Sequence, residues 1–542
     1  MTGAALPAKD IATLSGAHSV ERAVRLSTSK LWQAQRDYFT RVGRAAWSSD
    51  TVPHYITSNP SIAASYAEVV LAFLRDCDAQ GQLDRSRPVH IVELGSGSGR
   101  FAFYLLNRLR SLIAGSLLAG TSVRYVLTDF APGKLDVLKG HPALKEWIEE
   151  GTVDFACVDV MAPGPITLEQ SGEKIGSRSK GARSPVVLIS NYVLDSVPQD
   201  CFMIRQGELH EGLLTVTAPS PDADLADPAM LEKIVLNWQP RPIGERYYGN
   251  EAYDRILADY RDVLDDTSFL FPAAMLDCAR RMVRDASGPV LWIAADKGYG
   301  RAEDLLGQDE PNLVLHGGAF SLMVNFDAVR RYVIGDGGQA FHPRHRPLSL
   351  VVAAYLMQTG GAPFVETAHA YSDCLADGGP DDFFAVKTLV RPGTMTMSAE
   401  QMLAYLRFTH WDSAVFLECF SPLLDLAPSI PDALKPDVAM ACRRVADNYF
   451  WIGEETDVHL CLGLILSGIH YFRESLPYFE SSIALRGPTA NAFFGLAVSH
   501  YGLRDLETGL RHAREALGLE PGFSGARSLK ATIEAQLAAP SR

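Results

Sequence analysis

The sequence lacks both a long apolar run and an excess of basic charge. No stretch reaches the roughly 18 to 20 consecutive apolar residues that a membrane-spanning helix needs, and the longest apolar segments, such as 348–357, fit buried helices or strands. The formal net charge of −14 argues against broad adhesion to nucleic acid or anionic lipid, because both favour a basic surface. We therefore predict a soluble protein that binds neither nucleic acid nor a membrane.

Also lacking are a secretory signal and the cysteine spacing typical of zinc sites or disulfide frameworks. Residues 1–11 include Lys9 and Asp10 but no apolar core followed by a small-residue cleavage site. The eight cysteines are widely scattered, with no CxxC pair. The sequence therefore predicts a cytoplasmic protein without a metal site, in which most cysteines are reduced and buried.

What the sequence does have is enough chain for several domains. Its 542 residues exceed one compact core, and a content of 47% hydrophobic and 21% charged residues is ordinary for a folded protein. From residue 88, short apolar runs alternate with helical segments, which predicts an α/β domain with a parallel sheet. The candidate strands are 89–94, 123–128, 153–157, 186–190 and 290–295.

We predict three parts: an N-terminal helical lid (1–87), an α/β domain (88–390) and a helical domain (391–542). Helical apolar spacing runs through 19–47, and a second helix is expected at 61–76. Segment 164–184 has the composition of a mobile surface insertion outside the core, whereas the aromatic-rich insertion 200–287 is expected to form a substrate-side cap. The strand-like segment 383–390 would end the α/β domain.

An internal repeat with an offset of 34 residues lies near the C-terminus, within about 457–522. Leu462 matches Leu496, Gly468 matches Gly502, and the later apolar positions match in the same way. This period resembles that of tetratricopeptide repeats, whose stacked helix pairs expose a concave surface for polypeptides. The module therefore either recruits a protein or peptide partner or only docks against and stabilises the rest of the chain.

The strongest motif is an apolar strand that runs into a glycine-rich turn, in which Glu93 precedes Gly95, Gly97 and Gly99. A dinucleotide-binding fingerprint would place a further glycine where Arg100 stands, and no Lys-Ser or Lys-Thr follows as in a phosphate-binding loop. The E-x-G-x-G-x-G order instead resembles the first motif of class I S-adenosylmethionine-dependent methyltransferases. The resemblance implies a Rossmann-like sheet, S-adenosyl-L-methionine as cofactor, and Glu93 as a residue that holds its cationic methionyl end.

Two further acids follow predicted strands where this fold would use them. Asp129 ends the second strand, and a carboxylate there can accept hydrogen bonds from both ribose hydroxyls. Asp159 follows the third strand, from which the methyltransferase class binds the adenine amino group. With their neighbours Phe130 and Val160, and with Asn191 at the end of the fourth strand, they complete the predicted cofactor site.

A narrower resemblance covers about 47–390. Segment 191–198 is similar to the N-E-x-x-D-A-L-P segment of the MidA-type family, which includes a mitochondrial complex I assembly factor that methylates arginine. Segments 54–62, 295–300 and 320–326 resemble that family's F-x-T-S-P-x-I, I-D-Y-G-Y and D-L-T-A-H-V-D-F segments in the same order. Tyr192 replaces the family's glutamate and Asn325 an aspartate, which weakens the case for a guanidinium acceptor, because carboxylates bind guanidinium best.

We expect Asp195 to orient or deprotonate an acceptor nitrogen, with Tyr192 and Asp296 lining the pocket, because methyl transfer depends mainly on alignment and on exclusion of water. The alternative for Asp195 is a structural acid at a helix start. His342 and His345 are expected to be solvated loop residues, and His54 and Tyr55 to pack against the lid.

Three functions remain open from the sequence. The first is an N-methyltransferase that acts on a protein or peptide side chain recruited by the repeats, with arginine as one candidate acceptor. The second is a catalytically inactive scaffold or assembly factor that keeps the methyltransferase fold, which the altered Tyr192 and Asn325 would suit. The third is a small-molecule methyltransferase whose repeats dock the enzyme or form a homodimer.

Overall fold

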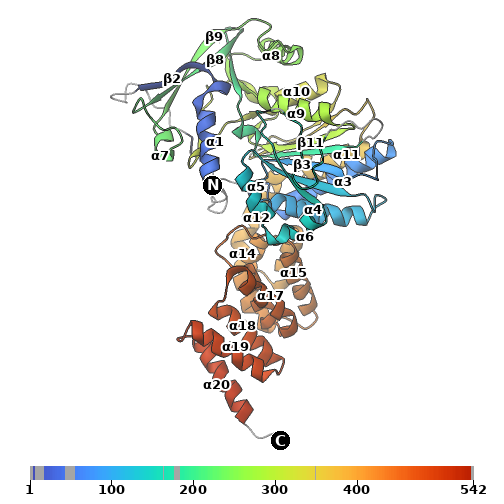
Figure 1. Cartoon of the computed structure of the whole chain (residues 1–542), viewed down its shortest axis with the longest axis vertical. Coiled ribbons are helices and arrows are strands. Elements are labelled where there is room, and N and C mark those ends of the chain that lie inside the picture. The colour runs from blue at the N-terminus through green and yellow to red at the C-terminus, as the bar shows by residue number, and fades with distance from the viewer. Residues whose placement is uncertain are drawn as a thin grey trace. The chain divides into compact units, whose positions relative to one another are not determined.

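The computed structural model describes residues 4–5, 18–42, 55–162, 164–175, 184–347 and 349–538. The chain divides into two compact units, Met1–Phe384 and Ala385–Arg542. The first unit is mixed α/β and the second is helical (Figure 1). Within the described ranges, no helix is long and apolar enough to cross a membrane.

A seven-stranded sheet forms the centre of the first unit, in the order β16-β17-β11-β6-β3-β4-β5. Five strands are parallel to their neighbours: β3 (Val89–Leu94), β4 (Val123–Asp129), β5 (Val153–Cys157), β6 (Val186–Asn191) and β11 (Val290–Asp296). They confirm the five predicted strands to within one residue at each end. β17 (Val351–Met357) runs antiparallel to β11, and β16 (Gln339–Phe341) antiparallel to β17.

The strand order reverses at β3, which lies between β4 and β6. The chain moves outward to β4 and β5 on one side and returns to β6 and β11 on the other, which opens a crevice at the carboxyl ends of the strands. The glycine turn follows β3 at this crevice and leads into α4 (Arg100–Ala114). Gly95, Gly97 and Gly99 all have left-handed φ values, of 62°, 55° and 76°, a conformation that other residues rarely adopt.

Helices pack around this sheet: α3 (Pro60–Ala79), α5 (Pro132–Lys139), α6 (Lys145–Glu149), α9 (Ala273–Asp285), α10 (Phe326–Gly335) and α11 (Val365–Tyr371). The predicted helix at 61–76 is confirmed as α3. It begins after Asn59, whose side chain accepts a hydrogen bond from the Ile62 nitrogen at 3.1 Å, and Pro60 occupies its first turn. Both features favour a helix start.

The predicted cap, 200–287, contributes most of a second, antiparallel sheet (Figure 1). Its strands are β7 (Asp200–Arg205), β8 (Glu208–Ala218), β9 (Val235–Pro242), β10 (Thr267–Phe271) and, from the N-terminal segment, β2 (His18–Arg25). Two short helices, α7 (Pro228–Leu231) and α8 (Glu251–Val263), complete the insertion. This sheet is separate from the central one and shares no strand with it.

The helix predicted over 19–47 is wrong in its first part. Residues His18–Arg25 form strand β2, which pairs with β8 through two register shifts, and the helix α1 is confined to Lys30–Val42. The pairing partners lie about 190 residues away, so no local spacing could indicate them. Glu21 then marks the change to helix, since its carboxylate accepts hydrogen bonds from Ser29 Oγ and the Lys30 nitrogen. Trp47 lies outside the described residues.

Two other segments also differ from the prediction. Segment 383–390 is not a strand but the end of helix α12 (Pro380–Val390), in which Pro380, Asp381 and Asp382 occupy the first turn; these residues favour a helix start. In the insertion at 164–184, Ile166, Leu168 and Ile175 are buried in the core instead of lying at the surface. Residues 176–183 of that insertion lie outside the described ranges.

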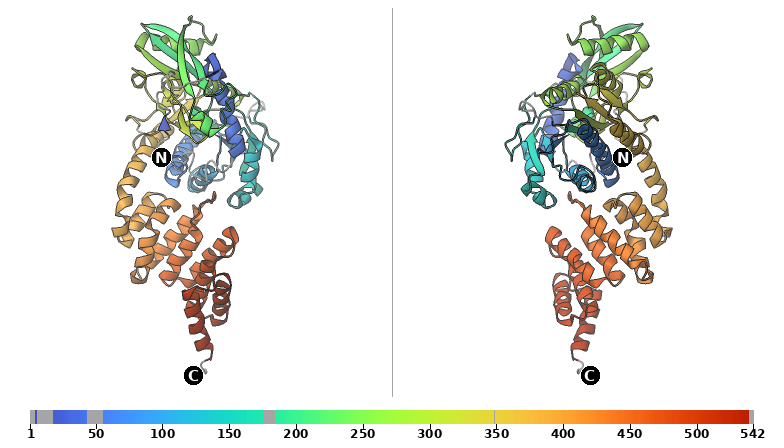
Figure 2. Two further views of the ribbon diagram at one scale, coloured as in Figure 1. Left: turned by 90° about the vertical axis from the view of Figure 1, so that its left-hand side faces the viewer. Right: turned by 90° about the vertical axis from the view of Figure 1, so that its right-hand side faces the viewer.

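Helices follow one another through the second unit: α13 (Ala399–Phe408), α14 (Ser413–Leu426), α15 (Lys435–Asp447), α16 (Val458–Gly468), α17 (Phe472–Arg486), α18 (Ala490–Gly502), α19 (Leu506–Leu519) and α20 (Ser524–Ala538). From α16 onward, each helix packs against the next one along the chain (Figure 2). The pairs α16–α17 and α18–α19 recur at an offset of 34 residues, from Phe472 to Leu506 and from Gly468 to Gly502. Their assignment to the tetratricopeptide class stays a prediction.

Candidate functional site

Two adjoining pockets occupy the crevice at the carboxyl ends of the central strands. The glycine-turn pocket is lined by the turn after β3, by the end of β6 and by the hairpin of β13 (Val314–His316) and β14 (Ala319–Ser321). The α1 pocket is lined by α1, by residues that follow β4 and β5, and by 193–198. Phe39, Gly95, Tyr192 and Ser196 line both pockets, so the two are continuous.

Glu93 lines the glycine-turn pocket with a carboxyl that is only 4% exposed. Its Oε2 atom has no hydrogen-bond partner among the described residues. Burial raises the pKa of this carboxyl to about 8, against the opposing effect of the neighbouring Tyr125 phenol. A buried acid with one oxygen that lacks a hydrogen-bond partner is costly to the fold and suited to binding a cation brought by a ligand.

Asn191 contributes the complementary group to the same pocket. Its Oδ1 atom accepts a hydrogen bond from the Tyr66 hydroxyl at 3.0 Å, which fixes the side chain. Its Nδ2 atom is buried and has no partner among the described residues. Asn191 therefore gives the pocket a donor, and Glu93 an acceptor, that the protein itself leaves unsatisfied.

The glycine turn between these groups is held by hydrogen bonds to β4. The Ser96 nitrogen donates to the Thr128 carbonyl, and the Thr128 nitrogen donates to Ser96 Oγ, both at 2.8 Å. A side chain at Gly95 would lie 3.2 Å from Val193 Cγ2 and would also require a left-handed φ. The turn thus keeps its backbone open to the pocket.

Asp129 ends β4 and lines the α1 pocket. Its Oδ1 atom accepts a hydrogen bond from the Ala131 nitrogen at 2.9 Å, and its Oδ2 atom lies 3.5 Å from Lys134 Nζ. Burial raises the pKa of the carboxyl, and the Lys134 ammonium opposes the shift. The same ammonium lies 5.1 Å from the centre of the Phe130 ring. Asp129 is therefore held in place at the strand tip as expected.

Asp159 and Val160 also line this pocket, but Asp159 is already engaged. Its two carboxylate oxygens accept hydrogen bonds from the Arg36 guanidinium at 3.1 and 2.8 Å. That guanidinium lies over the Phe130 ring, 4.4 Å from its centre. Arg36 belongs to α1, so this helix is fixed across the α1 pocket by an ion pair that the sequence did not indicate.

Asp195 lines the glycine-turn pocket, whereas Asp296 is fully buried behind it and does not line either pocket, contrary to the expectation. Ser196 Oγ donates to Asp195 Oδ1 at 2.7 Å. Burial raises the pKa of Asp195 to about 6 and that of Asp296 well above its usual range, and the Asp195 charge adds to the shift at Asp296. Burial thus disfavours the charged form of both carboxyls.

Tyr192 lines both pockets and has a left-handed backbone, with φ 54°. Its nitrogen donates to the Ala295 carbonyl at 2.9 Å, which fixes the strained turn. Its hydroxyl is buried and has no partner among the described residues, and burial raises its pKa. The phenol is therefore a neutral donor at the junction of the two pockets.

Sequence reasoning missed several pocket residues. Lys297, His316 and Ser321 line the glycine-turn pocket, and Arg36 and Gln35 line the α1 pocket. Lys297 stands where the resembled I-D-Y-G-Y segment has tyrosine, and that difference was the available signal. The others come from a helix and a hairpin whose positions depend on long-range packing, so the sequence carried no comparable signal for them.

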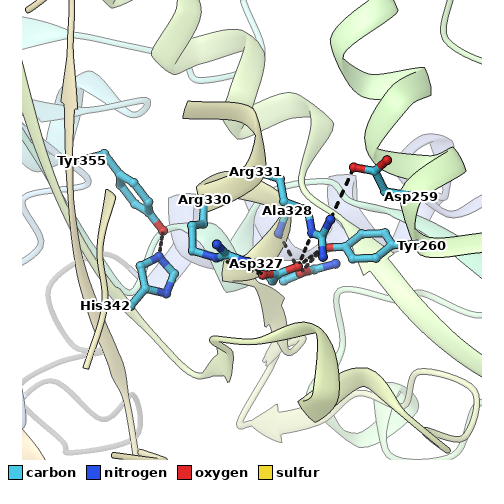
Figure 3. A network of polar contacts seen from close by, with 9 residues as sticks. Asp259, Tyr260, Asp327, Ala328, Arg330, Arg331, His342 and Tyr355 are labelled. Atoms are coloured by element: carbon cyan, nitrogen blue, oxygen red, sulfur yellow. Dashed lines mark hydrogen bonds and ion pairs between the residues drawn. The ribbon is translucent and has the colours of Figure 1, made fainter. Parts of the chain in front are cut away.

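Asn325 is a structural residue and lies outside both pockets. It caps α10 by accepting a hydrogen bond from the Ala328 nitrogen at 3.0 Å. In the same network, Asp327 is fully buried and binds Arg330 and Arg331 (Figure 3). Asn325 stands where the MidA-type family has an aspartate, and this replacement therefore affects the network around α10 and not the lining of either pocket.

His342 is half-buried and not the solvated residue that was expected. Its Nε2 atom lies 3.1 Å from the Tyr355 hydroxyl (Figure 3), and burial lowers its pKa to about 4. His345 is exposed, as expected. Tyr55 packs edge-on against Phe384, with ring centres 5.6 Å apart, whereas His54 lies outside the described residues.

No cluster of three or more metal-ligating side chains occurs in the part of the chain that the structure describes. The eight cysteines are free thiols, and six of them are buried, whereas Cys157 is exposed and Cys374 partly so.

No family model matches the sequence, and no curated protein matches it. Among solved structures, an uncharacterized protein from Burkholderia thailandensis is 13% identical, with a TM-score of 0.37, over 64% of this chain and 97% of that one. A second protein of the same superfamily and organism, bound to S-adenosyl-homocysteine, is 15% identical, with a TM-score of 0.34, over 57% of this chain and 79% of that one. Neither similarity is high enough to define the family of this chain.

Proposed function

We propose that the chain is an S-adenosylmethionine-dependent methyltransferase. The observation that carries the proposal is the pair of unsatisfied groups in the glycine-turn pocket, Glu93 Oε2 and Asn191 Nδ2. The methionyl end of the cofactor carries an ammonium, which needs an acceptor, and a carboxylate, which needs a donor. One buried acid and one buried amide on either side of an open glycine turn fit those two needs.

The α1 pocket fits the remaining part of the cofactor. Asp129 would accept hydrogen bonds from the ribose hydroxyls, and the Phe130 ring and Val160 would line the adenine site. A carboxylate oxygen has two lone pairs, so Asp159 could still accept from the adenine amino group while it binds Arg36. The reversal of strand order at β3 supports this proposal, because Rossmann-like sheets bind ligands at the carboxyl ends of the strands beside such a reversal.

When bound, the cofactor would supply a sulfonium methyl group, and an acceptor atom that attacks the methyl carbon in line would displace S-adenosylhomocysteine as the leaving thioether. The protein would contribute alignment and exclusion of water. Asp195 lines the glycine-turn pocket and would orient an acceptor or take its proton, while Ser196 holds one oxygen of its carboxyl group. Asp296 would act behind it as a positioning residue, while Tyr192 lines both pockets at their junction.

We further propose that the acceptor belongs to a protein or peptide. The support is the repeated helix pairs of the second unit, because arrays of such pairs commonly bind polypeptides. Arginine is the acceptor that the MidA-type resemblance suggests. The charges of the glycine-turn pocket, however, favour an acceptor other than a guanidinium. An inactive scaffold remains the reading to adopt if the cofactor does not bind.

Isothermal titration with S-adenosylmethionine and S-adenosylhomocysteine tests the proposal. We expect both to bind, and Glu93→Gln to weaken binding roughly tenfold or more, because it removes a charged hydrogen bond. Asp129→Asn should also weaken it. Glu149→Gln and Asp136→Asn make the same chemical changes at exposed positions and should bind normally. Binding of neither compound to the unmodified chain would overturn the assignment.

A further inference from the structure

The glycine-turn pocket contains a cation, Lys297, to which the proposed cofactor contacts assign no role. Lys297 follows β11 directly and is the only lysine or arginine that lines this pocket in the described part of the chain. No ion pair or side-chain hydrogen bond of its ammonium occurs within the described ranges. Its backbone is fixed on both sides, since its nitrogen donates to Asp296 Oδ1 at 2.9 Å and its carbonyl accepts from Val324.

The neighbours of Lys297 are mostly neutral donors. His316 Nε2 lies 3.1 Å from Ser321 Oγ on the β13–β14 hairpin, and both residues line the pocket. Burial lowers the pKa of His316, and the charge of Lys297 lowers it further, so the imidazole is neutral at physiological pH.

Among the residues that the structure describes, two carboxyls line the same pocket, those of Glu93 and Asp195. Glu93 would be taken by the ammonium of the cofactor. Asp195 is already engaged, since its Oδ1 atom accepts a hydrogen bond from Ser196 and the charge of Lys297 acts on its carboxyl. A guanidinium would therefore meet an ammonium without a free acid to bind it, whereas a carboxylate would meet an ammonium and hydrogen-bond donors.

We propose that the methyl acceptor is a molecule that carries a carboxylate, which Lys297 binds through an ion pair, with Ser321 and His316 beside it. This inference rests on the proposed methyltransferase function and names its substrate class. An acidic side chain of a polypeptide and a small free carboxylic acid share this chemistry.

The test is isothermal titration of the full chain, saturated with S-adenosylhomocysteine, with three probes. N-acetylglutamic acid amide represents an acidic side chain, glutarate a free acid, and N-acetylarginine amide the guanidinium alternative. We expect at least one carboxylate probe to bind at millimolar concentrations and more tightly than the arginine probe. Tighter binding of the blocked glutamate points to a polypeptide, and tighter binding of glutarate points to a small acid; both support the inference.

Variants of Lys297 make the test specific. Lys297→Gln should weaken binding of the carboxylate probe roughly tenfold or more and should leave binding of the arginine probe unchanged or make it tighter. Lys297→Arg should retain most of the affinity for the carboxylate probe. Lys233→Gln, at an exposed position on another segment, is the matched control and should behave as the unmodified chain. Each variant is first titrated with S-adenosylhomocysteine, and a loss of that binding confined to Lys297→Gln would assign Lys297 to the cofactor and overturn the inference.

The inference is overturned if no carboxylate probe binds, if the arginine probe binds more tightly, or if Lys297→Gln leaves the carboxylate affinity unchanged. These failures are separable from failure of the methyltransferase proposal, because S-adenosylhomocysteine binding is measured first. A chain that binds this compound but no carboxylate is a methyltransferase with a different acceptor.

Discussion

The Oδ2 atom of Asp296 accepts a hydrogen bond from the backbone nitrogen of Asp195 at 3.0 Å. Its Oδ1 atom accepts another from the Lys297 nitrogen at 2.9 Å. One fully buried side chain at the end of β11 thus fixes both the loop after β6 and the residue after β11. The acid and the base that line the glycine-turn pocket are positioned by the same carboxyl group.

Asp296→Asn should therefore destabilise this part of the sheet. An amide has one oxygen, so one of the two backbone nitrogens would face an NH₂ group instead of an acceptor. A lost buried acceptor costs about 1–3 kcal/mol. Native-state hydrogen exchange of β6 and β11 amides measures the change, and Asp222→Asn at an exposed position is the control. Unchanged exchange in the Asp296 variant would show that the two hydrogen bonds contribute little.

Glu93 should make stability and cofactor binding depend on pH in opposite directions. Burial raises its pKa to about 8 from the ordinary 4.5, so the native state holds a proton that the unfolded chain releases. This stabilising contribution is complete below pH 4.5 and is lost as the pH rises through 8. Glu93→Gln should abolish that part of the pH dependence, as measured by urea unfolding between pH 5 and 8.

Binding of the cofactor should release a proton at neutral pH. An ammonium beside Glu93 would lower its pKa, so affinity should increase as the pH rises toward about 8. Titrations in two buffers with different ionisation enthalpies count the protons released. Equal binding enthalpies in both buffers would mean that Glu93 is already ionised in the free protein.

Arg36 should control how tightly the α1 pocket holds its ligand. Arg36→Ala removes two hydrogen bonds to Asp159 and the contact with the Phe130 ring, which frees α1 from the adenine site. We expect roughly a tenfold loss of affinity for S-adenosylhomocysteine, since hydrogen bonds between charged groups are the strong ones. Arg22→Ala, on the exposed side of β2, is the control and should leave binding unchanged.

The central sheet and the cofactor site could be predicted because their signals are local. A buried parallel strand appears as a continuous apolar run, as in β3 and β6, and the glycine turn and the acids come directly after such runs. Strand β2 could not be predicted, since eight residues with mixed spacing became a strand only through pairing with β8. The ion pair of Arg36 with Asp159 spans 123 residues and depends on the position of α1.

The buried position of Asp296 could not be predicted from the sequence either. Its place at the end of a strand predicted a side chain in the pocket, as for Asp129. Whether a strand-end acid faces the crevice or the neighbouring loop depends on the residues packed over it, here the loop after β6 that presents the Asp195 nitrogen. Lys297, the next residue, lines the pocket instead.

Asp327 should be important for stability and not for ligand binding. It is fully buried and binds Arg330 and Arg331 (Figure 3). Burial opposes its ionisation, but the two arginines more than offset this effect and lower its pKa. Asp327→Asn leaves two cations with weakened partners and should cost about 3 kcal/mol, as for other broken buried ion pairs. Urea unfolding measures the cost, and affinity for S-adenosylhomocysteine in the folded variant should be unchanged.

In the repeated helix pairs, two glycines leave space for the ring of Phe479. A side chain carbon at Gly463 of α16 would lie 2.7 Å from Phe479 Cε1, and one at Gly495 of α18 would lie 2.3 Å from the same atom. Gly463→Ala should therefore destabilise the second unit by about 1–3 kcal/mol through overpacking.

Gly518→Ala is the matched control, because Gly518 lies in α19 with no atom within 4 Å of the added carbon. There the exchange should stabilise the helix by about 0.5–1 kcal/mol. Hydrogen exchange of α16–α19 amides in the full chain measures both changes, and equal effects of the two substitutions would mean that the ring does not pack against Gly463.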